Sequence, residues 1–216
     1  MNFIQEDKQV TDFGKREINK ARTRLDTLDA VYRLTRRTSF RDLKVRTIAE
    51  ETGITEMTFF NHFPRKEDIL KYMMGLWALD LMALQHRKPL SGEAAIRRVF
   101  DRTAKKVRKH PRLVTSFVAT MLSSEIDPHA MEIEPVDRYL IYPDLPDLHV
   151  ARIPSGNEIL LHHLAEMDPA PDLAATLLHL ASCFYGDIVV AHTAGLDIGE
   201  LYESSLDLIF RKVSTD

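Results

Sequence analysis

Hydrophobic residues recur at helical spacing along nearly the whole chain, and the alternating pattern typical of strands is scarce. A first amphipathic stripe runs over residues 15–37 and stops at a Thr-Ser pair. Glycine and proline then divide the chain, and further helices are predicted over residues 43–52, 55–62, 66–85 and 91–109, with another beginning at Pro111. The pattern therefore predicts an all-α fold.

Residues 124–154 depart from this regularity, because they hold five prolines among many acidic residues. The segment is too long for a plain connector, and we expect it to form a lid or an extra short helix over a pocket. Helical periodicity returns over residues 155–167, 171–193 and from 197 to the end. Capping-box patterns, at Ser155 with Glu158 and at Asp197 with Glu200, mark two of these helix starts.

Charge is distributed unevenly along the chain. Residues 1–112 contain 25 Lys and Arg against 15 Asp and Glu, whereas residues 113–216 contain 4 against 17. A basic front half suits a polyanionic partner, since neutralising phosphates supplies most of the sequence-independent affinity for DNA. A charge difference that arose by chance or serves only solubility is the alternative at this point.

The sequence disfavours several classes of protein. No run of about 18 uninterrupted apolar residues is present for a membrane span, and the N-terminus lacks the basic-then-apolar order of a signal peptide, so we expect a cytoplasmic protein with no membrane partner. Cys183 is the only cysteine, which excludes an internal disulfide and a cysteine-based zinc site. No phosphate loop, nucleophile elbow or paired-carboxylate motif points to an enzyme, and no cofactor is expected.

The nine histidines raise the question of a metal site. His162 and His163 are adjacent, which places their side chains about 100° apart on a helix and disfavours joint ligation. His129 and His149 lie in the irregular acidic segment without tight ligand spacing. We therefore expect no metal site.

Residues 39–70 contain the one spacing that calls for a specific mechanism. A helix-turn-helix needs a small residue where its two short helices cross and a glycine at the turn, and Ala49 and Gly53 occupy these positions. The second helix of such a motif enters the major groove and reads base edges. A purely structural helical hairpin is the alternative. The apolar residues available for buried contacts are Leu43, Val45, Ile48, Ile54, Phe59 and Phe63. The polar residues left to face outward are Arg46, Thr47, Thr55, Glu56, Thr58, Asn61 and His62.

This segment resembles the tetracycline-repressor (TetR) family of transcriptional regulators. The resemblance covers roughly residues 25–70, and the remaining two thirds of the chain are similar in helical layout alone. It implies an all-helical homodimer that binds operator DNA through paired helix-turn-helix units and releases it when a small-molecule effector fills the C-terminal domain. The matching residues are Ile48-Ala49, Gly53-Ile54-Thr55, Thr58-Phe59-Phe60-Asn61-His62-Phe63 and Lys66-Glu67.

The resemblance also implies roles for individual residues. Arg46 resembles a base reader, and Glu56, Met57 and Thr58 open the recognition helix, where they meet base edges or nearby phosphates. The family usually has a tyrosine where this chain has Phe60, and Thr-Thr where it has Leu43-Lys44. The first departure removes a hydroxyl that bonds a phosphate, and the second exchanges hydroxyl contacts for one charge.

Three residues follow at the end of the motif. Asn61 and His62 resemble positions used for base-methyl and backbone contacts, with a packed, hydrogen-bonded histidine as an equal alternative for His62. Lys66 matches a lysine whose amine, with the adjacent helix N-terminus, holds a phosphate. The complete expected DNA-binding set is Lys44, Arg46, Thr47, Thr55, Glu56, Met57, Thr58, Phe60, Asn61, His62 and Lys66.

The last two predicted helices each carry an apolar stripe, and Gly186 in the middle of the first fits the close approach of another backbone. In the resembling family these helices pack against their copies, so we expect a homodimer through them, with an intramolecular core as the alternative. The stripes are Leu177, Ala181, Phe184 and Ile188 on one helix and Leu201, Ser205, Leu208 and Ile209 on the other.

An effector pocket is expected inside the C-terminal body, lined by aromatic and flexible apolar residues that are equally candidates for the core. Such a lining favours an apolar or amphipathic effector. The helix over residues 66–85 is the expected lever, because it begins beside the DNA and passes Trp77. The candidate ligand-binding residues are Met73, Trp77, Leu81, Phe100, Phe117, Met121, Tyr139 and Phe184.

Two domains are therefore expected: an N-terminal arm with the helix-turn-helix over residues 1–64, and a larger effector-binding and dimerisation domain over residues 65–216. The predicted function is a ligand-responsive repressor. A constitutive or architectural DNA-binding protein without an effector and a structural helical adaptor stay open as alternatives. The basic run over residues 97–112 is expected to be a solvated face paired with the acidic half rather than a second DNA contact.

Overall fold

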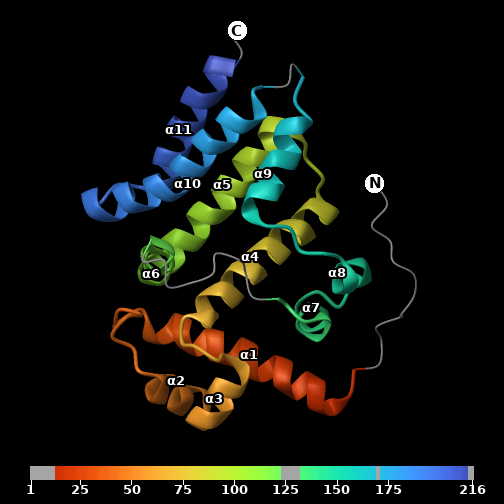
Figure 1. Ribbon diagram of the computed structural model, residues 1–216, viewed down its shortest axis with the longest axis vertical. Helices are drawn as coiled ribbons and strands as arrows, with labels where there is room; N and C mark the ends of the chain where they lie inside the picture. The colour runs from red at the N-terminus through yellow and green to blue at the C-terminus, as the bar shows by residue number, and fades with distance from the viewer. Residues whose placement is uncertain (1–12, 123–131, 169–170, 214–216) are drawn as a thin grey trace. The chain divides into compact units, whose positions relative to one another are not determined.

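The computed structural model describes residues 13–122, 132–168 and 171–213. Within these ranges the chain forms eleven α-helices and no strand, which confirms the all-α prediction (Figure 1). The helices are α1 (Lys15–Leu34), α2 (Val45–Thr52), α3 (Glu56–His62), α4 (Asp68–Arg87), α5 (Gly92–Lys109), α6 (Pro111–Leu122), α7 (Pro135–Ile141), α8 (Pro146–Val150), α9 (Gly156–Ala165), α10 (Leu173–Ala194) and α11 (Ile198–Val213).

The described residues fall into two compact units. The first lies within Met1–Ala83 and Pro128–Ile153, and the second within Leu84–Asp127 and Pro154–Asp216. Most of α4 belongs to the first unit and its last turn to the second. The two domains expected over residues 1–64 and 65–216 stay a prediction, but the compact unit that holds the helix-turn-helix extends beyond residue 64.

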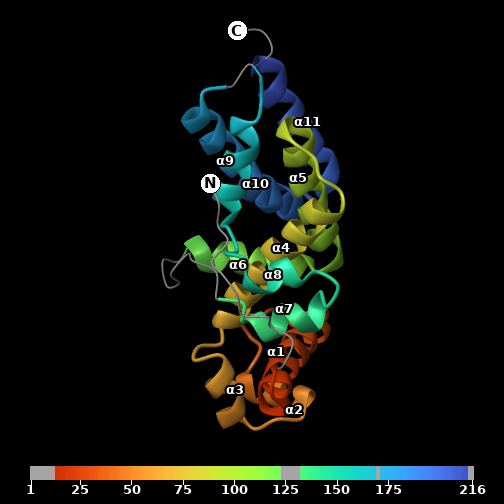
Figure 2. The same ribbon diagram turned by 90° about the vertical axis from the view of Figure 1, so that its right-hand side faces the viewer.

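The first unit is built around α1, which packs against α2 on one side and α7 on the other. Figures 1 and 2 both show α2 and α3 on the side of α1 opposite to α7. The small and branched side chains of Ala21, Ala30 and Val31 are completely buried, which lets the neighbouring helices approach closely. Ile69 and Leu70 of α4 are equally buried. The helix-turn-helix is therefore held by a continuous apolar core.

The acidic segment folds into α7 and α8, which belong to this first unit. Pro135 stands at the first position of α7, and Asp137 completes a capping box with Glu134. Arg138 secures the pair of helices, because its guanidinium donates to the carbonyls of Ile133 (2.7 Å) and Ala151 (2.5 Å). The prediction of an extra short helix is confirmed, and α7 packs on α1, while its expected place over an effector pocket stays a prediction.

A buried ion pair attaches α7 to α1. Arg24 of α1 donates to both carboxylate oxygens of Asp137, at 3.1 and 2.9 Å, and its side chain is 5% exposed while that of Asp137 is fully buried. Tyr72 of α4 donates its hydroxyl to Asp137 at 3.0 Å, and Arg24 also contacts Glu134 at 2.9 Å. Because charges are costly to bury without partners, these contacts make the position of α7 specific.

The second unit contains α5, α6, α9, α10 and α11. Helix α11 packs against both α5 and α10. Its core holds three rings: Phe100 lies 5.3 Å from Phe184 and 4.8 Å from Tyr202, both edge to face. Tyr202 also donates its hydroxyl to the Phe184 carbonyl at 2.8 Å. A buried aromatic cluster thus joins α5, α10 and α11.

The basic run on α5 makes the ion pairs expected of it. Arg97 contacts Glu203 at 3.1 Å and Asp207 at 2.9 Å, both on α11. Arg108 contacts Asp197, which stands just before α11. At these two arginines, pairing with the acidic half is confirmed, and the guanidinium groups are already engaged within the second unit.

The ends of three helices can be compared with the ends and capping patterns predicted from the sequence. Ser155 accepts from the Glu158 N–H at 3.3 Å and Glu158 accepts from the Ser155 N–H at 2.7 Å, so this predicted capping box is confirmed. Ser91 does precede α5, as predicted, but without a side-chain cap. The first helix ends at Leu34 instead of residue 37, and the hydroxyl of Thr35, just beyond it, donates to the Val31 carbonyl at 2.7 Å.

Candidate nucleic-acid interface

The turn between α2 and α3 has the geometry of a helix-turn-helix. Gly53 ends α2 in the left-handed region, with φ of 74°, where a side chain would be strained. The N–H of Ile54 then donates to the Ala49 carbonyl at 2.9 Å, which satisfies a terminal carbonyl of α2. The predicted crossing residue Ala49 is 2% exposed, in keeping with close helix contact. Two small residues, Ala49 and Gly53, thus form the turn.

Thr55 begins the second helix of the motif. Its hydroxyl accepts from the Thr58 N–H at 3.1 Å and lies 2.9 Å from the Thr58 hydroxyl. Phe59 and Phe63 are completely buried, their rings 5.7 Å apart, and Phe63 packs against Tyr72 of α4 at 5.6 Å. The recognition helix is only seven residues long, so this aromatic anchor holds it in place.

The opposite face of α3 and the start of α2 are open to solvent. Met57 is 76% exposed and Phe60 45%, and Phe60 rests edge-on against Phe59 at 5.4 Å. Thr58 and His62 are half-buried. The other exposed members of the expected DNA-binding set are Lys44, Arg46, Thr47, Thr55, Glu56 and Asn61.

Arg46 is held by its own helix. Its Nε donates to Glu50 at 2.9 Å, and this hydrogen bond raises the pKa of the guanidinium. Both side chains are largely exposed, 76% and 63%, and such surface pairs contribute little to the stability of a helix. The pair therefore presents Arg46 at the surface and is easily broken when a better acceptor arrives.

Lys66 has a different environment from the one expected. Its amine donates to three backbone carbonyls, those of Phe40 (3.0 Å), Arg41 (2.9 Å) and Leu43 (3.1 Å), and lies 5.0 Å from the centre of the Phe40 ring. An ammonium group has three donors, so all of them are engaged. A phosphate at this amine would compete with the loop that leads into α2, and the expected phosphate contact stays a prediction.

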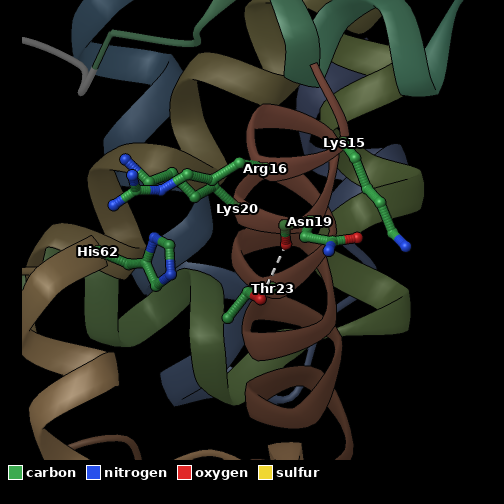
Figure 3. A pocket seen from close by; sticks show the side chains of 6 residues that line it. All are labelled: Lys15, Arg16, Asn19, Lys20, Thr23 and His62. Atoms are coloured by element: carbon green, nitrogen blue, oxygen red, sulfur yellow. Dashed lines mark hydrogen bonds between the residues drawn. The ribbon is translucent and has the colours of Figure 1, made fainter. Parts of the chain in front are cut away.

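His62 closes a hollow that the sequence reasoning missed. The hollow measures about 470 Å³, is open to solvent, and is lined by Lys15, Arg16, Asn19, Lys20 and Thr23 of α1 together with His62 (Figure 3). Burial lowers the pKa of His62, and the nearby charges of Arg24 and Lys20 lower it further. The signal available in the sequence was the spacing of Arg16, Lys20 and Thr23, which places them on one face of a helix.

The eight candidate ligand residues do not come together in one unit. Four of them, Met73, Trp77, Leu81 and Tyr139, belong to the first unit, and Phe100, Phe117, Met121 and Phe184 belong to the second. Trp77 is 5% exposed, and Phe100 and Phe184 are packed in the aromatic core described above. Their role in ligand binding stays a prediction.

Among the residues that the structure describes, one group has ligand atoms close enough for a metal. His162, His163 and Glu166 place their atoms within 4.8 Å of one another, because Glu166 lies one turn after both histidines. His163 contacts Glu166 at 2.7 Å, and this hydrogen bond lowers the pKa of the carboxyl. The two adjacent histidines thus share Glu166 as a partner, which the i+3 and i+4 spacing allows on a helix.

Comparison with known proteins agrees with this geometry. Residues 28–73, which run from the middle of α1 into α4, match the model of bacterial regulatory proteins of the tetR family. This segment of the chain is similar to the TetR family. The match covers α2, the turn and α3 completely, so the segment similar to the family is the one described above as anchored by Phe59 and Phe63.

Two solved structures share the TetR-like fold. Thermus thermophilus FadR, a TetR family transcriptional repressor in complex with lauroyl-CoA, is 21% identical, with a TM-score of 0.54 over 87% of this chain and 93% of that one. A TetR transcriptional regulator from Rhodococcus sp. RHA1 is 16% identical, with a TM-score of 0.54 over 89% and 97%. At these identities the likeness concerns the fold. No curated protein sequence matches the chain.

Proposed function

We propose that this TetR-family protein is a ligand-responsive repressor that binds operator DNA through α2 and α3. One observation carries the proposal: a short helix with a completely buried aromatic side presents Glu56, Met57, Phe60 and Asn61 to solvent on the other side. A seven-residue helix with such an anchor and such a face is suited to enter a major groove. An operator-binding protein acts where the DNA is, so we place it in the cytoplasm.

The residues divide into base readers and backbone contacts. Arg46 and Asn61 are proposed to read bases, since a guanidinium pairs with guanine and an amide with adenine. Glu56, Met57 and Thr58 meet the groove at the start of α3. Lys44, Thr47, Thr55, Phe60 and His62 are proposed to lie against the sugar-phosphate strands. For Lys66 we propose an indirect role, in which its amine fixes the loop before α2.

A homodimer through α10 and α11 is proposed from apolar residues that the second unit leaves uncovered. Leu178, Val189 and Val190 of α10 are 69%, 43% and 44% exposed, and Leu208 of α11 is 69% exposed. A methyl group added at Gly186 would meet nothing within 4 Å, so room remains there for another backbone. The predicted apolar stripe on α10 is only partly available to a second copy, because Phe184 and Ile188 are buried inside the unit.

The same uncovered face explains an unusual property of α10. This helix is apolar enough to cross a membrane by length and composition, with a mean hydropathy of 1.6 and 22% of the window buried. One such helix is weak evidence for a membrane span. A second copy covering the face accounts for it through the hydrophobic effect, and two DNA half-sites require that symmetry.

The effector is proposed to be a small apolar or amphipathic molecule. Thermus thermophilus FadR, with the same fold, was solved with lauroyl-CoA. A ligand releases DNA only if it binds the released state more tightly, and α4 is the proposed lever because it starts beside the helix-turn-helix and ends in the second unit. A constitutive DNA-binding protein lacks this release.

The test uses purified protein and the DNA upstream of its own gene. Footprinting and titration compare the wild type with R46A/N61A and with K105A/N157A, which removes one cation and one amide from exposed sites on α5 and α9. We expect a protected site that R46A/N61A abolishes and the control keeps. Equal binding by all three proteins would overturn the assignment of α2 and α3. Lauroyl-CoA serves as the first probe for release, and release without a change in melting temperature would argue against a bound effector.

A further inference from the structure

We propose that the hollow between α1 and the end of α3 binds a phosphate of the DNA backbone, as a second anchor beside the recognition helix. The hollow is defined by Lys15, Arg16, Asn19, Lys20, Thr23 and His62 and is open to solvent (Figure 3). This inference rests on the proposed function, because it assumes that α3 lies in the major groove. It assigns α1 a contact that neither the helix-turn-helix motif nor the family match identifies.

The charges of the hollow point to an anion. Figure 3 shows Arg16 and Lys20 extending from α1 on the side where His62 lies, with Lys15 pointing the other way. Arg16 and Lys20 are one turn apart on the same helix face, so they repel each other and gain from a shared negative partner. Two cations held side by side without a counter-charge form a site for a phosphate group.

Other basic residues in this unit already have partners. Arg24 pairs with Asp137 and Glu134, and Arg33 contacts Glu51 at 2.9 Å. In the part of the chain that the structure describes, no carboxylate pairs with Arg16 or Lys20. The nearby acid Glu134 contacts Arg24 at 2.9 Å and pairs with neither Arg16 nor Lys20. The positive potential of the hollow is thus left for a molecule from outside.

Polar groups complete the site. The side-chain amide of Asn19 is exposed and offers donors, whereas the hydroxyl of Thr23 already donates to the Asn19 carbonyl at 2.9 Å. His62 lines the hollow, and burial, together with the charges of Arg24 and Lys20, lowers its pKa. The arrangement places two cations beside polar groups, which suits the negative charge of a phosphodiester.

The position of the hollow favours DNA over a free anion. His62 is the last residue of α3, so the hollow begins where the proposed base-reading face ends. A strand of the duplex that passes α3 has phosphates on either side of the groove, and the next one is available to a cation just beyond the helix. An open hollow of about 470 Å³ admits a continuous sugar-phosphate chain, whereas a small free anion is better held by an enclosed site.

The salt dependence of DNA binding tests the proposal directly. The variant R16Q/K20Q leaves a polar side chain at both exposed positions and removes their charge. The matched control K105Q/K109Q removes two exposed charges from α5 in the second unit. Because each neutralised phosphate contributes about 0.9 to the logarithmic salt slope, a dimer that loses one phosphate per subunit loses about two from its slope. We expect affinity to fall on the order of tenfold or more at ~0.1 M salt, equally for operator and unrelated DNA.

The outcomes separate the two proposals. If the wild type binds no DNA, the proposed function fails; if it binds and R16Q/K20Q keeps the wild-type slope, only the hollow is wrong. A loss of slope shared by K105Q/K109Q would also overturn the site, since net charge would then explain it. Inorganic phosphate is titrated in parallel by calorimetry. Binding of inorganic phosphate that depends on Arg16 and Lys20, with unchanged DNA affinity, would identify a free anion as the ligand and overturn the DNA contact.

Discussion

Arg24 and Asp137 are separated by 113 positions in the sequence and form a buried ion pair with distances of 3.1 and 2.9 Å. Burial raises the pKa of Asp137, while Arg24 and the Tyr72 hydroxyl oppose that rise. The pair fastens the acidic segment to the helix on which the helix-turn-helix is built. We infer that the segment is a structural part of the DNA-binding unit.

Removing one partner of the Arg24–Asp137 pair is expected to destabilise the first unit strongly. R24M leaves Asp137 buried with the Tyr72 hydroxyl as its remaining side-chain partner, and such losses cost about 3–5 kcal/mol. The measurement is urea unfolding followed by circular dichroism. The double variant R24M/D137L should recover much of the loss, because two apolar groups replace two charges. A single variant as stable as the wild type would show that the segment is not fastened here.

Lys66 offers a test of how this lysine works. K66M removes an ammonium that donates to three carbonyls, and we expect a loss of about 2 kcal/mol in unfolding free energy together with weaker operator binding. The salt slope should stay unchanged if the amine does not touch a phosphate. A slope reduced by about two for the dimer would instead establish the direct phosphate contact. K71M, which removes a lysine paired with Asp68, is the control for stability.

Phe60 stands where the resembling family usually has a tyrosine. Because its ring is 45% exposed, F60Y should add a hydroxyl at the surface without changing the melting temperature. One new hydrogen bond to a phosphate contributes about 1 kcal/mol, which is about fivefold in operator affinity. Gel-shift titration measures this gain. Unchanged affinity would place the Phe60 ring away from the DNA strand.

The uncovered face of α10 and α11 predicts how the dimer can be broken. A glutamate at Val189 or Leu208 puts a charge where two apolar surfaces are proposed to meet, and the dimer should weaken by at least tenfold, or about 1.4 kcal/mol. Light scattering after size exclusion measures the mass. V150E changes a residue that is 62% exposed on α8 and is the control. Intact dimers in both glutamate variants would move the interface elsewhere.

The hydrogen bonds of the Asp197 carboxylate lead us to expect that stability depends on pH in the acidic range. Its carboxylate accepts from Arg108 Nε at 2.9 Å and from the N–H groups of Gly199 and Glu200 at 2.9 and 3.1 Å, which lowers its pKa from 3.8 to about 2. A lowered pKa in the folded state means that the stabilisation is present above pH 3.8 and is lost as the pH falls towards 2. D197N should therefore lose less of its melting temperature over this range than the wild type. D168N, at an exposed carboxylate, should behave like the wild type.

Local rules predicted the helix-turn-helix and the ends of several helices. Gly53 and Ala49 act through neighbours within a few residues, so their geometry follows from spacing. The buried face of α3 was predicted for the same reason, because Phe59 and Phe63 are one turn apart. Short-range contacts are those that a sequence pattern encodes most directly.

Contacts between residues far apart in the sequence could not be predicted from local spacing. The acidic segment looked like a lid because nothing in its spacing reveals that Asp137 meets Arg24. The phosphate contact of Lys66 was predicted without knowing that loop carbonyls accept hydrogen bonds from its amine. The hollow beside His62 depends on how α1 and α3 pack, although the spacing of Arg16 and Lys20 on one helix face was available. In each case tertiary contacts decided what a local pattern left open.

The docking of α7 on α1 limits how this protein can be dissected. A truncated gene ending after α4 would produce a headpiece whose Arg24 has lost Asp137 and whose α1 has lost its α7 neighbour. Such a fragment should be unstable in solution even though it contains every proposed base-reading residue. A functional headpiece has to carry α7 and α8 as well, for instance supplied as a separate peptide or joined through a designed linker.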